Sequence, residues 1–149
     1  MNRRLFIQAS SALSLLAVAP FLVASHAQNT GATGQKRHKI VIQVSDNDPA
    51  KWNLALNNAK NLQEDVGAAN VDIEIVAYGP GIGMLKLESP SGSRVAEAMT
   101  ANVKVIACEN TMRGQKLTRD DMLSAISYVP AGVTEIMTKQ SEGWSYLRP

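Results

Sequence analysis

The stretch KIVIQVSDNDPAKWNLALNNAKNLQEDVGAANVDIEIVAYG, residues 39–79, contains the signals that decide the fold. It begins with a short run of β-branched residues between polar ones, which is typical of a strand. Asp48 and Pro49 then supply an N-cap and a proline at the first position of a helix. Apolar residues at helical spacing follow as far as Gly67, where the helix should end. These residues are Trp52, Ala55, Leu56, Ala59, Leu62 and Val66.

The end of this stretch, residues 70–79, predicts a second strand, because its apolar residues first alternate and then become continuous. Beyond it, GPGIG at residues 79–83 is interpreted as a plain turn. Its glycine spacing matches neither the dinucleotide fingerprint nor a P-loop, which argues against nucleotide binding. A helix is predicted over residues 94–102 and a strand directly after it, over residues 103–107.

The remaining chain predicts one more helix and one more strand. Thr118 to Asp121 resembles a capping box, so a helix is expected from there to about Val129, before Pro130. Residues 133–138 are expected to form the last strand, followed by a tail. Strands that alternate with helices imply a parallel sheet covered on both faces. The sequence therefore predicts an α/β protein, a three-layer α/β/α sandwich with a mainly parallel sheet and flavodoxin-like layering.

The first 27 residues have the layout of an export signal. Paired arginines precede an apolar stretch, residues 9–24, and a small-x-small pattern ends at Ala27. The apolar stretch is shorter than the ~20 residues that span a bilayer, which argues against a retained anchor. A general export signal with two chance arginines is the alternative to a twin-arginine signal. We expect a twin-arginine signal peptide (1–27), a flexible tether (28–37), one domain (38–149) and a periplasmic protein.

The charge balance of the mature domain argues against nucleic acid or a membrane as a partner. The whole chain has 15 Lys and Arg residues against 13 Asp and Glu residues. Cleavage near Ala27 removes Arg3 and Arg4 and none of the acidic residues, so the mature domain is formally neutral. Binding to a polyanion requires a basic surface. We therefore expect no nucleic-acid partner and no membrane association of the mature form.

The reactive side chains of the mature chain exclude most kinds of catalytic site. His38 is its single histidine and stands at the edge of the tether, which argues against a histidine-dependent triad or dyad. One cysteine and one peripheral histidine cannot supply the three or four ligands of a zinc site. The acidic residues of SDNDP, residues 45–49, lack the glycine and distal glutamate of a calcium loop. No metal and no cofactor is expected.

Cys108 is the only cysteine of the chain and follows the strand predicted over residues 103–107. A cysteine at the end of a buried strand is commonly a small inert hydrophobic residue, and packing is one interpretation. The other interpretation is chemical, because ligands of parallel α/β sheets gather beyond the carboxyl ends of the strands. If a helical turn begins there, its N–H groups would favour a thiolate; Arg113 and Lys116 add positive charge, and Glu109 opposes them.

The spacing after Cys108 separates two kinds of cysteine loop. A cysteine-dependent phosphatase needs arginine six positions after the cysteine, where this chain has Gly114. Arg113, five positions after it, is compatible with a rhodanese-like loop. A thiolate can also hold a sulfur atom as a persulfide with no metal or histidine.

Three asparagines, Asn53, Asn57 and Asn61, form a row along one face of the first predicted helix. Asparagine is a poor helix former, so the row calls for an explanation. The amides either face solvent or bond a neighbouring loop or subunit, and the sequence leaves both interpretations open.

Residues 38–149 resemble the DsrE/DsrF-like family, and an exported branch of it, in four motifs. These are SDNDPAKWNLALNNAKNLQ, VAYGPGIGMLK, ACENTM and GWSYLRP. The family consists of small α/β proteins associated with sulfur relay, in which a cysteine at a strand end is followed by a short stretch of small residues and Arg-Gly. Glu109 and Asn110 stand where that pattern usually has alanines.

The resemblance implies that Cys108 accepts a sulfane sulfur, with Asn110, Thr111, Arg113 and Gly114 as the residues that line the site. It also implies a homo-oligomer, a trimer or hexamer, and a sulfur donor or acceptor that is a protein or a small thiol. Three functions stay open at this point. They are a sulfur carrier, a rhodanese-type sulfurtransferase, and a non-catalytic oligomeric binding or scaffold protein whose cysteine only packs.

Overall fold

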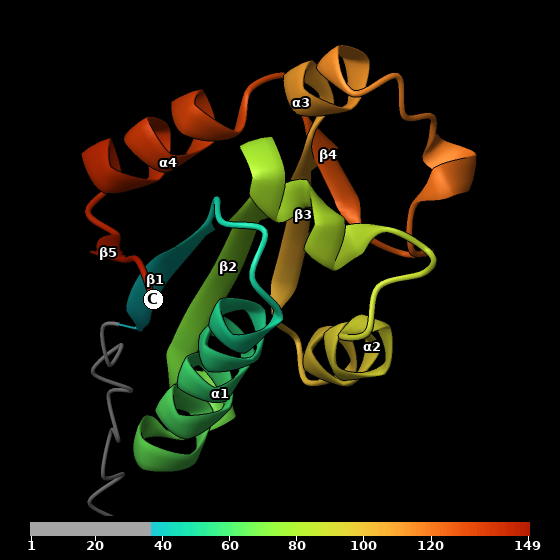
Figure 1. Cartoon of the computed structure of the whole chain (residues 1–149). Coiled ribbons are helices and arrows are strands. Elements are labelled where there is room, and N and C mark those ends of the chain that lie inside the picture. The colour runs from blue at the N-terminus through green and yellow to red at the C-terminus, as the bar shows by residue number, and fades with distance from the viewer. Residues whose placement is uncertain (1–36) are drawn as a thin grey trace, which may run out of the picture. The chain divides into compact units, whose positions relative to one another are not determined.

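The computed structural model describes residues 37–149; the predicted signal peptide and residues 28–36 of the predicted tether lie outside the described residues. The described part forms a five-stranded sheet with helices on both faces (Figure 1). The strands are β1 (His38–Val44), β2 (Val71–Ala77), β3 (Lys104–Cys108), β4 (Ser127–Val129) and β5 (Ser145–Leu147). The helices are α1 (Pro49–Val66), α2 (Gly92–Thr100), α3 (Glu109–Gly114) and α4 (Gly132–Ser141), and the short 3-10 helices are η1 (Ala68–Asn70), η2 (Gly79–Leu85) and η3 (Arg119–Asp121). Within residues 37–149, no helix has the length and apolar character needed to cross a bilayer.

All strand pairings are parallel, and the strand order is β4-β3-β2-β1-β5. The chain adds β2, β3 and β4 in one direction and then returns to place β5 beside β1 (Figure 1). Crossovers between parallel strands are right-handed, so a reversal of direction moves the connecting helix to the opposite face. Accordingly α1 and α2 cover one face of the sheet and α4 covers the other, which confirms the predicted α/β/α layering.

The β1–α1–β2 unit forms as residues 39–79 predict. The Oδ1 of Asp48 accepts a hydrogen bond from the Ala50 N–H at 2.9 Å, and Pro49 opens the helix. Gly67 ends it with a φ of +85°, a conformation that L side chains rarely adopt. β1 and β2 then pair along their full lengths.

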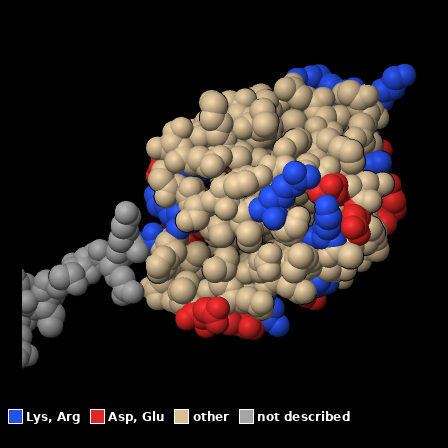
Figure 2. Space-filling model, turned by 60° about the vertical axis from the view of Figure 1, so that its left-hand side comes forward, with Lys and Arg blue, Asp and Glu red and all other residues tan. Residues whose placement is uncertain are grey.

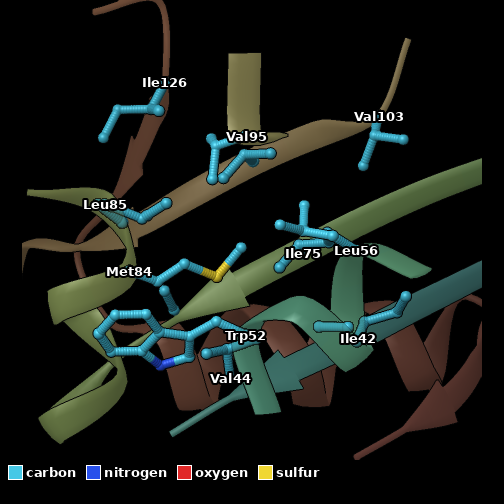
Figure 3. Packing of buried hydrophobic residues seen from close by; sticks show 14 of the residues in the cluster. Ile42, Val44, Trp52, Leu56, Ile75, Met84, Leu85, Val95, Val103 and Ile126 are labelled. Atoms are coloured by element: carbon cyan, nitrogen blue, oxygen red, sulfur yellow. The ribbon is translucent and has the colours of Figure 1, made fainter. Parts of the chain in front are cut away.

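The larger core lies between the sheet and the helices α1 and α2 (Figure 3). In this core Trp52 of α1 is almost fully buried and lies close to Met84 and Val44. Its Nε1–H donates to the carbonyl of Asp46 at 2.7 Å, so the polar atom of this large side chain is satisfied. The predicted apolar face of α1 is buried at Trp52, Ala55, Leu56 and Ala59 and half-buried at Leu62 and Val66.

The smaller core lies on the other face of the sheet, under α4 alone. Val41, Val76 and Ile106 project from the three inner strands, and Ile136 of α4 packs on them. The remaining apolar residues of α4 include Val133, which is 62% exposed. A single helix therefore covers this face through a narrow apolar contact.

The asparagine row of α1 joins this helix to α2. Arg94 of α2 donates to Asn53 Oδ1 at 2.6 Å and to Asn57 Oδ1 at 2.7 Å. Asn61 lies exposed at the end of the row. Two of the three amides, those of Asn53 and Asn57, therefore bond a neighbouring element. That element is a helix rather than a loop or a subunit.

The helix predicted from Thr118 to Val129 is wrong. The capping box exists, since the Thr118 N–H donates to Asp121 Oδ2 at 2.7 Å, but it opens only the single turn η3. After that turn the chain pairs with residues 85–87: the Leu87 N–H donates to the Asp121 carbonyl at 3.0 Å. Ala125, with a φ of +64°, prevents a helix from resuming, and residues 127–129 form β4.

The strand predicted over residues 133–138 is also wrong, because these residues lie in α4. The β-branched residues of this segment favour a strand locally. A parallel connection from β4 back to β5 requires a crossover, however, and a helix satisfies all backbone groups of the crossing segment. The last strand is β5, three residues inside the predicted tail.

Candidate functional site

Cys108 is the last residue of β3, and α3 begins at the next residue with no loop between them. The side chain lies on the face that α4 covers. Gly132, the first residue of α4, packs directly against it, since a β-carbon built on Gly132 would lie 3.3 Å from the Cys108 Cβ. The thiol is free of disulfide bonding and only 4% of the residue is exposed. The start of α4 therefore closes over the cysteine.

Polar groups from two segments, α3 and the start of α4, act on the Cys108 sulfur. Burial raises the pKa of the Cys108 thiol, but the Thr111 hydroxyl and the N–H groups of Gly132, Thr111 and Asn110 lower it more, and the pKa lies below its ordinary value. The Thr111 Oγ1 also accepts a hydrogen bond from the Gly79 N–H at 2.8 Å. Because that oxygen is occupied as an acceptor, its own hydrogen is available to the sulfur. A buried site thus favours a thiolate.

The carboxylate of Glu109, the residue next to Cys108, forms an ion pair. Arg119 Nη2 lies 3.0 Å from Glu109 Oε1, and its guanidinium stacks 4.4 Å from the centre of the Tyr128 ring. Glu109 was expected to oppose a thiolate at Cys108. Pairing with Arg119 reduces that opposition.

The other predicted site residues occupy the outer side of α3. Arg113 Nη2 donates to Asn110 Oδ1, and both side chains lie exposed. Gly114 ends the helix in open space, with no atom within 4 Å of a built β-carbon. The structure therefore brings Thr111 to the sulfur, while the Asn110 N–H donates to the Pro130 carbonyl and the Asn110 and Arg113 side chains form a separate surface pair.

Two glycines that the sequence did not single out as site residues, Gly79 and Gly132, complete the surroundings of Cys108. Gly79 orients Thr111 through its N–H, and Gly132 allows α4 to approach the sulfur. Both follow the ends of strands that neighbour β3. A glycine just beyond a strand end was the available signal, but their approach to β3 depends on the strand order.

Cys108 lies at a topological switch point of the sheet. The connection that leaves β3 packs Met112 of α3 into the larger core, whereas the connection that leaves the adjacent β4 packs Ile136 of α4 into the smaller one. Two neighbouring strands thus send their chains to opposite faces beyond their carboxyl ends. This is where open α/β sheets bind ligands.

Neither a metal centre nor the groove between α1 and α2 competes with this site in residues 37–149. No group of three His, Cys, Asp or Glu side chains there is arranged to hold a metal ion. A groove of about 240 Å³ lies between α1 and α2, lined by Leu56 and Arg94 among others. It is on the opposite face of the sheet from Cys108.

A parallel α/β/α sandwich with a polarised thiol at the carboxyl end of an inner strand defines a class of small α/β cysteine proteins. Residues 38–149 match the DsrE/DsrF-like family, and the chain belongs to that family. The family is associated with sulfur relay in general. The predicted family is therefore confirmed for this domain.

Solved structures share the fold. The protein of unknown function MTH1491 from Methanobacterium thermoautotrophicum is 34% identical, with a TM-score of 0.72, over 75% of this chain and 99% of that one. The conserved protein of unknown function BT1422 from Bacteroides thetaiotaomicron is 11% identical, with a TM-score of 0.60, over 74% and 94% of the two chains. The ychN protein from E. coli is 12% identical, with a TM-score of 0.58, over 76% and 99%. Among curated proteins, none matched.

Gly132→Ala should destabilise the domain by about 1–3 kcal/mol, the usual cost of overpacking a filled site. The new methyl group would lie 3.1 Å from the Tyr78 Cβ and 3.2 Å from the Val76 Cγ1. Val76 belongs to β2 and Tyr78 follows its last residue, so neither atom can move freely. Gly92→Ala is the matched control, because Gly92 also opens a helix but faces only the end of the flexible Leu123 side chain, at 3.3 Å. Urea denaturation measures both. Equal losses of unfolding free energy in the two variants would contradict the close packing of α4 on Cys108.

Proposed function

We propose that this protein is a sulfur carrier in which Cys108 holds a sulfane sulfur as a persulfide. The Cys108 thiolate attacks the outer sulfur of a donor persulfide, a new S–S bond forms, and the donor leaves as a thiolate. An acceptor thiolate then attacks the outer sulfur on Cys108 and restores the Cys108 thiolate. Each step exchanges one S–S bond for another and needs no oxidant, metal or cofactor.

The observation that carries this proposal is the set of donors around the sulfur. A cysteine that serves only as packing material has no need of a hydroxyl and N–H groups that lower the pKa of its thiol. Here the pKa of Cys108 lies below its ordinary value although burial alone would raise it, because the Thr111 hydroxyl and the Gly132 N–H favour the thiolate. The same donors would stabilise the negative charge of a bound persulfide. Membership of a family associated with sulfur relay supports this interpretation.

The burial of Cys108 favours a second candidate, a non-catalytic binding or scaffold protein whose cysteine only packs. At 4% exposure the thiol needs a movement of its surroundings before a donor can reach it. The Asn110 N–H donates to the Pro130 carbonyl at 3.0 Å, so the segment that precedes α4 is tied to α3 across the cysteine. Opening of this segment is the movement that the sulfur-carrier proposal requires.

Incubation of the reduced protein with polysulfide should add about 32 Da, the mass of one sulfur atom, and dithiothreitol should remove it. Intact-mass spectrometry of the native protein measures both changes. The Cys108→Ser variant should fold, because the change is small, and gain no mass. Its circular dichroism spectrum provides the control for folding.

The alternative has an opposite outcome in the same experiment. A native thiol that gains no sulfur, and that iodoacetamide alkylates only after denaturation, would assign Cys108 to packing. The family and the fold would stand, and the sulfur-carrier function would not.

Export and self-association complete the proposal. The N-terminal pattern supports cleavage near Ala27 and a periplasmic location. Figure 2 brings the side of α4 and β5 forward, and uncharged residues make up most of it. Val133 and Met137 of α4 and Tyr146 of β5 are exposed there, at 62%, 61% and 42%. Contact between copies through this side would cover these side chains.

A further inference from the structure

Glu74, in the middle of β2, is a buried carboxyl group beneath α4. It is 1% exposed, and its Oε2 lies 3.2 Å from Lys104 Nζ on β3. Its Oε1 is buried and accepts no hydrogen bond from the described residues. An ionised carboxylate in this position would leave one oxygen without a donor, which is costly.

The missing partner is a second carboxyl group, Glu135, in the first turn of α4. Burial raises the pKa of Glu74, Lys104 lowers it, and the Glu135 carboxylate, within hydrogen-bonding reach, raises it again, with a net rise. A protonated Glu74 can donate its O–H to Glu135, which accounts for an oxygen without a donor. A protonated Glu74 would thus join β2 to α4 through Glu135.

The carboxyl pair lies close in sequence to the part of α4 that closes the thiol site. Glu135 comes three residues after Gly132, which packs on Cys108, and one residue before Ile136, the buried apolar contact of the helix. Because one helical turn spans these residues, a displacement at Glu135 moves Gly132 as well. Glu135 and the cover of Cys108 therefore belong to one rigid element, α4.

We propose that Glu74 and Glu135 form a proton-dependent latch that holds α4 on the sheet and thereby controls access to Cys108. The latch rests on the proposed function, since it regulates entry to the same thiol. In the closed state the Glu74 O–H donates to the Glu135 carboxylate. When the proton leaves to solvent, two carboxylates face each other in a buried place and α4 separates from the sheet more readily.

The surrounding charges only partly offset this repulsion. From β3, Lys104 contacts Glu74 but is half exposed. From α4, Lys139 acts on Glu74 too: burial lowers the pKa of Lys139, but the charge of Glu74 and those of Glu142 and Glu135 raise it more. Its Nζ lies 3.6 Å from Glu135 Oε1 and 3.4 Å from Glu142 Oε2, so one cation is shared by three carboxyl groups. On the remaining two elements, Lys39 of β1 lies over the Trp144 ring, and Asp72 of β2 pairs with Arg37.

The sign of the pH dependence follows from the raised pKa of Glu74. A carboxyl group whose pKa is raised by folding contributes stability that is complete below the ordinary glutamate pKa, about 4.3, and lost as the pH rises through the raised value. The latch is therefore closed in acid and loosens toward neutral pH.

Hydrogen exchange of the α4 amides, corrected for the intrinsic rate, tests the latch by mass spectrometry across this pH range. In the wild type, protection of the peptide that covers residues 132–141 should fall several-fold as the pH rises. Glu74→Gln should abolish the fall, because a neutral amide still donates to Glu135 at every pH. Glu135→Gln should abolish it as well, because its amide can donate to an ionised Glu74.

Glu142→Gln is the matched control, since Glu142 lies on the same helix and bonds the same lysine but does not raise the pKa of Glu74. In this variant the protection of the α4 amides should depend on pH as it does in the wild type. Should Glu74→Gln fail to fold, Glu135→Gln decides the question alone. A wild-type course without pH dependence, or the same course in Glu135→Gln, would overturn the latch.

These outcomes are independent of sulfur chemistry, because the measurement reads helix amides. A pH-dependent α4 in a protein that takes up no sulfur would refute the sulfur carrier and keep the latch as a property of the fold. Sulfur uptake in a protein whose α4 protection does not depend on pH would support the sulfur carrier and refute the latch.

Discussion

Gly81→Ala should leave the domain unfolded or nearly so, with a loss of about 4 kcal/mol or more in the free energy of unfolding. Gly81 is buried in η2, where a built β-carbon would lie 2.3 Å from the Val44 carbonyl oxygen and 2.6 Å from its carbon. Both atoms are backbone, so no side chain can turn aside to make room. Such a loss is a large part of the 5–15 kcal/mol that stabilises a typical domain.

The backbone that Gly81 meets cannot shift without breaking the sheet. Val44 ends β1, and its carbonyl accepts a hydrogen bond from the Tyr78 N–H at 3.1 Å, which fixes the turn into η2. Displacement of this carbonyl would disturb β1, β2 and the approach of Gly79 to Thr111 together. Gly81→Ala should therefore also abolish any reactivity of the native thiol.

Urea denaturation followed by circular dichroism measures the effect of Gly81→Ala. Gly114→Ala provides the control, because that site has no atom within 4 Å of the new methyl group and lies at the end of a helix. It should leave the stability within about 1 kcal/mol of the wild type or raise it. An unchanged unfolding midpoint for Gly81→Ala would contradict the close packing of η2 on β1.

Thr111→Val should lower the rate at which the native Cys108 thiol is alkylated near neutral pH by about tenfold or more. Valine keeps the size of the side chain but removes the hydroxyl that helps to lower the pKa of Cys108. A hydrogen bond to a charged group contributes about 1.5–3 kcal/mol, and each 1.4 kcal/mol changes the thiolate fraction about tenfold. The uptake of sulfur should fall in parallel with the alkylation rate.

The pH dependence gives this prediction a signature that a structural defect does not share. The alkylation rate of the wild type should rise with pH around a midpoint below the ordinary thiol pKa, and in Thr111→Val the midpoint should move upward. For the same reason, the thiolate contributes stability above the ordinary thiol pKa that is lost as the pH falls through the lowered value.

Thr111→Ser is the matched control for Thr111→Val, because it retains the hydroxyl and should retain the midpoint. Thr111→Val also leaves the Gly79 N–H without its acceptor, which should cost about 1–3 kcal/mol of stability. Rates are therefore compared only where denaturation curves show both variants folded. Identical midpoints in the two variants would show that the Thr111 hydroxyl does not act on the sulfur.

Local signals predicted an element correctly where nearby residues cap its ends and its apolar residues form one face. Asp48, Pro49 and Gly67 define the limits of α1 through their own backbone preferences, and the helical spacing from Trp52 onward matches the buried face. The strand that leads to Cys108 was predicted for the same reason, since a continuous apolar run suits an inner strand. The three-layer fold follows from the alternation of such elements.

Local signals failed where distant segments compete for the same backbone groups. The capping box at Thr118 predicted a helix. Only one turn forms, because the backbone of residues 85–87 bonds the backbone of Asp121 and Leu123. Residues 133–138 have the composition of a strand, yet they form most of α4 because the chain must cross from β4 to β5. No window of the sequence contains the strand order that imposes this crossing.

The sequence by itself determined the fold class, the β1–α1–β2 unit and Cys108 as the one candidate thiol, because spacing, capping and residue chemistry act within a few residues. Only the tertiary structure decided what surrounds that thiol. Thr111 follows Cys108 in the chain, but Gly79 and Gly132 come from other segments, and Glu135, which raises the pKa of Glu74, lies on a helix far along the chain from β2. Such contacts depend on strand order and on the face to which each crossover leads, and these are properties of the whole sheet.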